Sequence, residues 1–107
     1  MKTAIILLAA VAASMLGQVM PGTAAGCRDD MLTADQNVRR TRTGLDNAAG
    51  DTDAAQCTAY RRHIDALSDY RSVIARCDRG PNQSQNVQAV DTEIVTLAPR
   101  MRAVCKP

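Results

Sequence analysis

The 107-residue chain contains no Phe and no Trp, and its only aromatic side chains are two tyrosines. Proteins that hold single-stranded nucleic acid stack its bases on aromatic side chains, so specific binding of nucleic acid is not indicated. The chain also has one histidine, His63, and no Cys-x-x-Cys sequence. A lone histidine without a nucleophile motif or a carboxylate cluster gives weak support for catalysis, and we expect His63 to lie at the surface. We therefore expect neither an enzyme nor a metal or other cofactor.

Long uncharged stretches are also scarce, and the one that is present lies at the N-terminus. Met1-Lys2 supplies a positive start, Ala4 to Leu16 is uncharged, and small residues precede Gly26. This pattern is typical of a secretory signal peptide cut after Ala25, so we assign residues 1–25 to it. The protein is then exported and has no membrane span after cleavage.

Two alternatives for the N-terminus are weaker. An uncleaved transmembrane helix needs about 20 apolar residues, whereas Gly17, Gln18 and Pro21 break this run. The stretch that ends at Cys27 loosely resembles a bacterial lipoprotein processing site. Lipidation of Cys27 would leave an odd number of cysteines in an oxidising compartment, which argues against it.

The mature chain, residues 26–107, has 82 residues, of which 12 are basic and 11 are acidic. A net charge of +1 predicts no general attraction to nucleic acid or to a membrane. Eleven of the basic residues are Arg and ten of the acidic residues are Asp. This bias suggests a GC-rich coding sequence and a bacterial source. The length allows one domain and excludes a large two-domain enzyme.

Three stretches of the mature chain carry apolar residues at alternating steps of three and four, which is the period of an amphipathic helix. They predict helices over about residues 28–49, 53–79 and 87–105. The residues of the three stripes are Cys27, Met31, Ala34, Val38, Thr41, Leu45 and Ala48; Cys57, Tyr60, Ile64, Leu67, Arg71 and Ile74; and Val87, Val90, Ile94, Leu97, Met101 and Val104.

Helix-breaking residues separate the stripes. Gly50 and Gly80-Pro81 stand where the first two helices should end, and Asp51 and Asn86 can cap the next two. The connections are therefore short, and short connections favour antiparallel neighbours. The sequence predicts an all-α domain over residues 26–107 with an up-down-up three-helix bundle.

The predicted helices select one of the three possible pairings of the four cysteines. Cys57 and Cys77 are about 30 Å apart on one helix, far beyond the 7 Å or so that a disulfide allows between Cα atoms. Cys77 and Cys105 would lie at opposite ends of the bundle. The remaining pairing joins Cys27 to Cys77 and Cys57 to Cys105. Since only 17 mature residues are apolar and larger than Ala or Cys, we expect the core to need both bonds.

The same disulfides define levels along the bundle, with an error of about one turn. Arg71 is level with Asp91, and a partly buried Arg needs a carboxylate, so we predict this ion pair. Tyr60 is level with Gly44, which suggests that the absent side chain makes room for the ring. The alternative is that Arg71 extends to water and that Gly44 has no such role.

A cluster of arginines shares one level near the Cys57–Cys105 end. Arg binds phosphates and carboxylates in a bidentate manner, so this belt is a possible anion-binding site. Asp46 and Asp65 lie within one helical turn of it, so an ordinary solvated surface of mixed charge is the alternative. The belt consists of Arg42, Arg61, Arg62, Arg100 and Arg102, with Arg39 and Arg40 close by.

These features predict a small exported protein without catalytic activity, located in the bacterial periplasm or secreted. The expected role is that of a structural or interaction module that presents a rigid helix face to another protein or to an anionic polymer. The alternative is a carrier that binds a small ligand or an anion in the Arg-rich belt or in the bundle interior, where Tyr60, Tyr70, Met31 and Met101 could line a cavity. The oligomeric state is not indicated.

Overall fold

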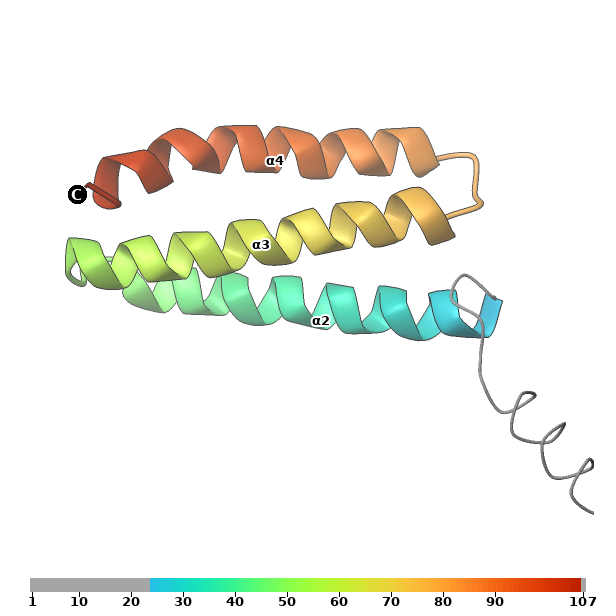
Figure 1. Ribbon diagram of the computed structural model, residues 1–107, viewed down its shortest axis with the longest axis horizontal. Coiled ribbons are helices and arrows are strands. Elements are labelled where there is room, and N and C mark those ends of the chain that lie inside the picture. Colours follow the sequence, from blue (N-terminus) through green and yellow to red (C-terminus); the bar gives the residue numbers. More distant parts are fainter. Residues whose placement is uncertain (1–23, 107) are drawn as a thin grey trace, which may run out of the picture.

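The computed structural model describes residues 24–106, which form three antiparallel helices and, over that range, no strand (Figure 1). The helices are α2 (Ala24–Ala48), α3 (Asp53–Cys77) and α4 (Gln83–Val104). The predicted up-down-up bundle is confirmed. Both α2 and α4 begin four residues earlier than expected, and α3 ends two residues earlier. The predicted signal peptide lies outside the described residues except for its last two.

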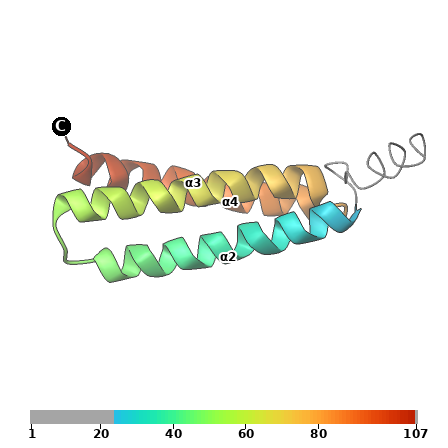
Figure 2. The same ribbon diagram turned by 60° about the horizontal axis from the view of Figure 1, so that its bottom comes forward.

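The middle helix holds the bundle together. α3 packs against both neighbours, whereas no Cα atom of α2 lies within 8 Å of one in α4. Figures 1 and 2 show the outer helices on different sides of α3. None of the helices in the described range has an apolar stretch long enough to cross a membrane.

The turn between α2 and α3 is built from a glycine and a threonine. Gly50 has φ +84°, a left-handed conformation that glycine adopts at helix ends without steric cost. Thr52 caps α3, because its side-chain oxygen accepts a hydrogen bond from the Ala55 amide. The prediction that Asp51 caps α3 is therefore wrong. Its carboxylate accepts instead from the Thr52 amide, at 2.8 Å.

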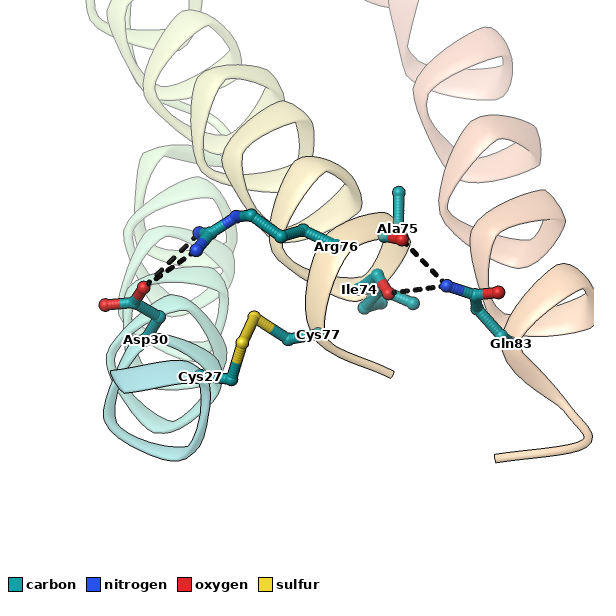
Figure 3. The surroundings of a disulfide bond; sticks show 7 residues. All are labelled: Cys27, Asp30, Ile74, Ala75, Arg76, Cys77 and Gln83. Atoms are coloured by element: carbon teal, nitrogen blue, oxygen red, sulfur yellow. Dashed lines mark hydrogen bonds and ion pairs between the residues drawn. A yellow bond between two sulfur atoms is a disulfide. The ribbon is translucent and has the colours of Figure 1, made fainter. Parts of the chain in front are cut away.

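Side chains fasten the turn between α3 and α4 (Figure 3). Gln83, the first residue of α4, donates from its amide to the carbonyl oxygens of Ile74 (3.3 Å) and Ala75 (2.7 Å). These carbonyls belong to the last turn of α3, where the Ile74 carbonyl also accepts from the Asp78 amide at 2.9 Å. The first turn of α4 thus stabilises the end of α3.

Asp78 is the second fastening of this turn. Its carboxylate accepts hydrogen bonds from the Asn86 side chain (3.0 Å) and from the Gly80 amide (2.9 Å). The bond from Asn86, followed by that from Gly80, lowers the pKa of Asp78. Asn86 lies inside α4 and does not cap it, contrary to expectation. The cap position belongs to Asn82, whose side chain makes no capping bond.

Two disulfides clip opposite ends of the bundle. Cys27 is bonded to Cys77 and Cys57 to Cys105, with Cα separations of 5.3 and 4.9 Å, which confirms the predicted pairing. Disulfides of this kind suit an oxidising environment. Arg76, next to Cys77, pairs with Asp30 at 3.3 Å beside the first bond (Figure 3). Cys27, the cysteine of the lipoprotein-like stretch, is engaged in the first disulfide.

The core is narrow and lies along the inner face of α3. Leu67, at 1% exposure, is its most buried apolar side chain, and Ile74 lies two turns further along. The expectation for His63 is wrong, because this side chain is also only 1% exposed and lies inside the bundle. The buried apolar cluster consists of Val38, Ala66, Leu67, Ile74, Val90 and Leu97.

Candidate functional site

The buried His63 joins all three helices. Its Nδ1 atom lies 2.8 Å from the hydroxyl of Thr41 on α2, and its Nε2 atom lies 3.4 Å from a carboxylate oxygen of Glu93 on α4. Arg42, the neighbour of Thr41, donates to the same oxygen of Glu93 at 3.0 Å. This side-chain contact bridges α2 and α4, which have no Cα atoms within 8 Å of each other.

Both ring nitrogens of His63 are engaged inside the protein. The Glu93 carboxylate can only accept, so it takes its hydrogen bond from Nε2–H, and the Thr41 hydroxyl can donate to Nδ1 or to the carbonyl oxygen of Asn37, 2.9 Å away. No buried side-chain nitrogen or oxygen atom in the described range lacks a hydrogen-bond partner. The residue type best suited to proton transfer near neutral pH is thus a structural link between helices.

Of the two contacts predicted from the levels along the bundle, one is confirmed. Arg71 forms an ion pair with Asp91, although both side chains are nearly half exposed. The expected contact between Tyr60 and Gly44 is wrong, because a Cβ atom added at Gly44 would meet nothing within 4 Å. The small residue leaves open space in the surface instead of room for the ring.

Charge is distributed unevenly along the bundle. The half nearer the Cys57–Cys105 bond, residues 39–65 and 94–106, has eight basic and four acidic residues. The other half, residues 26–38 and 66–93, has four basic and seven acidic residues. A chain that is almost neutral overall therefore has a positive and a negative end.

Two neighbouring hollows lie at the positive end, and Thr58 of α3 lines both. The α2–α3 hollow has a volume of about 360 Å³ and is lined by Arg40, Thr41, Gly44, Ala48, Ala55, Thr58, Ala59 and Arg62. The α3–α4 hollow is wider and shallower and is lined by Asp53, Ala54, Cys57, Thr58, Arg61, Val104, Cys105 and Lys106. We call the exposed surface formed by Arg40, Arg61, Arg62 and Lys106 around Thr58 the basic outer face.

These four cations have no ion-pair partner among residues 24–106. By contrast, Arg39 in the same half pairs with Asp35 at 3.0 Å. A guanidinium group without a protein carboxylate keeps its donors available for another anion.

The structure separates the residues of the predicted belt. Arg61 and Arg62 belong to the basic outer face, but Arg42 is turned toward Glu93. Arg100 lines a different hollow, with Tyr60 and Leu97, and Arg102 lines none of these.

Two members of the basic outer face were not in the predicted belt. The sequence levels put Arg40 only near the belt, and Lys106 is not among the belt residues. The signal available for Lys106 was its position next to Cys105, since the disulfide fixes that residue against the start of α3.

Within the described residues, no group of three or more His, Cys, Asp or Glu side chains is arranged to hold a metal ion. Comparison of the chain with protein-family models, with curated proteins and with solved structures found no match in any of the three.

Proposed function

We propose that this protein is an exported, non-catalytic interaction module that binds an anionic partner through its basic outer face. Its place of action is the bacterial periplasm or the cell exterior. The N-terminal pattern of a signal peptide and the two disulfides support export, because disulfides persist in oxidising compartments.

One observation carries the binding proposal. Four cations, from α2, from α3 and from the residues that follow α4, surround two hollows that share Thr58, and none is paired with a carboxylate in the described range. These surface cations have no ion pair within the described protein, so none has to break when an anion binds, and the rigid scaffold holds them in place. The uneven charge adds an orienting field that directs the positive end toward a negative partner.

The alternative of a carrier with an internal ligand has less support. Leu67 and His63, the two most buried large side chains, fill the centre of the bundle where such a ligand would lie. The engagement of both ring nitrogens of His63 likewise supports a role without catalysis.

Binding to immobilised heparin and to polyphosphate tests the proposal. The double variant Arg61→Gln/Arg62→Gln should elute at clearly lower salt than the unchanged protein, because each lost phosphate contact reduces the salt dependence of binding. The matched control is Arg28→Gln/Arg79→Gln, which removes the same charge from the acidic half. Equal losses in the two variants, or retention that does not respond to salt, would contradict the proposal.

Export is tested by a peptide map of the secreted, unreduced protein. The expected mature N-terminus is Gly26, and the expected linked peptides contain Cys27 with Cys77 and Cys57 with Cys105. An uncleaved N-terminus would contradict the export route, and a Cys27–Cys57 linkage would contradict the register on which the basic outer face depends.

A further inference from the structure

The α2–α3 hollow is unusual for a seam between packed helices. Half of its lining residues are small and apolar: Gly44 and Ala48 of α2, and Ala55 and Ala59 of α3. Small residues in a seam normally let two helices approach closely. Here a Cβ atom at Gly44 would reach no neighbour within 4 Å, so the space above it is open.

Arg40 of α2 and Arg62 of α3 line the same hollow. Neither has an ion pair with another described residue. The neighbouring α3–α4 hollow also has two cations, Arg61 and Lys106, but Asp53 shares it with them. The α2–α3 hollow is therefore the part of the basic outer face where positive charge is not offset by a lining carboxylate.

The lining indicates the chemistry of the occupant. A sulfated or phosphate polymer can pair with the arginines but has no apolar group to place over Gly44 and the alanines. A polypeptide can do both, because an aliphatic side chain can stand between acidic ones. Burial of that side chain adds apolar contact to the charge pairing.

We propose that the partner is a protein with an acidic segment that includes an aliphatic residue. The aliphatic side chain occupies the α2–α3 hollow, and the flanking carboxylates pair with Arg40 and Arg62. This inference rests on the proposed function, since it names the class of anion that the basic outer face binds.

Two blocked, fluorescently labelled peptides test the inference: Glu-Glu-Leu-Glu-Glu and Glu-Glu-Ser-Glu-Glu. Their binding to the purified, disulfide-bonded protein is followed by fluorescence anisotropy. The leucine peptide should bind about tenfold more tightly than the serine peptide, which is the gain from burial of part of a leucine side chain.

Gly44→Leu fills the hollow without touching the charges. Gly44 is an exposed helical residue, and leucine is a better helix former, so this variant should fold. It should bind both peptides equally weakly and bind heparin as the unchanged protein does. Arg40→Gln/Arg62→Gln should weaken the binding of both peptides. The control variant Arg28→Gln/Arg79→Gln should keep the preference for the leucine peptide and the order of the two affinities unchanged.

The outcomes separate the two proposals. If heparin binds and depends on Arg61 and Arg62, but the leucine peptide has no advantage or keeps it in Gly44→Leu, the partner is a polyanion. The inference is then overturned while the proposed function stands. If neither heparin nor the peptides bind, the proposed function itself is overturned, and the inference with it.

Discussion

Replacement of His63 by alanine should be among the most damaging single substitutions in this protein. The imidazole is only 1% exposed and lies between the three helices. Its removal leaves a cavity in a core that has few large side chains, and cavities of this kind cost about 2 to 4 kcal/mol. The free energy of unfolding of a domain of this size is about 4 to 12 kcal/mol, so the loss is a large fraction of the total.

His63→Leu separates the packing of His63 from its hydrogen bonds. Leucine has a similar volume, and neither polar partner is orphaned by it. Glu93 keeps its bond from Arg42, and the Thr41 hydroxyl keeps a backbone carbonyl acceptor. Exchange of a buried polar group for an apolar one is often nearly neutral under those conditions, so we expect a cost below about 1 kcal/mol.

Thr41→Val provides the complementary test. It leaves the Nδ1 atom of His63 buried without its partner, which should cost about 1 to 3 kcal/mol. In the His63→Leu background the same change should cost much less, because no polar atom then loses a partner.

Urea denaturation followed by far-UV circular dichroism measures the four variants and the unchanged protein. If His63→Leu is as unstable as His63→Ala, or if the Thr41 and His63 effects simply add, the reasoning from packing and partner satisfaction is refuted.

Three further predictions follow from the bonds at the periphery. Replacement of Cys57 and Cys105 by serine should lower the free energy of unfolding by about 4 kcal/mol, since a loop of nearly 50 residues opens; an unchanged urea midpoint would contradict the view that the core needs the bond. The pKa of Asp78 is lowered in the folded protein, so its stabilising effect is present above about pH 4 and is lost as the pH falls below that. The melting temperature should therefore drop less between pH 5 and pH 2 in Asp78→Asn than in the unchanged protein, and parallel curves would contradict this. Arg71→Gln should barely change the melting temperature, because its pair with Asp91 is nearly half exposed, and a large loss would show that this pair is more important than its exposure indicates.

The disulfide pairing could be predicted from the sequence because it depends only on rigid lengths. Cys57 and Cys77 lie 20 residues apart on one helix, so they cannot meet, and antiparallel packing then decides the remaining choice. The ends of the helices were less predictable. α4 begins at Gln83 because that side chain binds the carbonyls of α3, and this contact depends on the fold and not on the local pattern.

The burial of His63 was missed because α3 carries two interleaved stripes. One stripe contains Ile64 and Arg71, and the other contains His63 and Tyr70; Tyr60, Leu67 and Ile74 belong to both. Each stripe contains one strongly polar residue, either Arg71 or His63, so the hydropathy pattern does not show which of the two stripes is buried. A helix packed on two sides buries a wider face than one stripe covers. In the structure His63 is buried and contacts Thr41 and Glu93, whereas Arg71 pairs with Asp91 at the surface.

The basic outer face shows how much of a site's geometry can be predicted from the levels of its residues along the bundle. The two disulfides fix how far along the bundle each residue lies, and they brought the arginines of the belt to one end. They do not fix the direction in which a side chain points around the axis. Arg61 and Arg62 are adjacent, yet a step of about 100° per residue sends one toward α4 and the other toward α2. Arg42, at the same level, pairs with Glu93 of α4 instead. The candidate site thus depends on the rotation of each helix, which is set by the packing around Leu67 and His63.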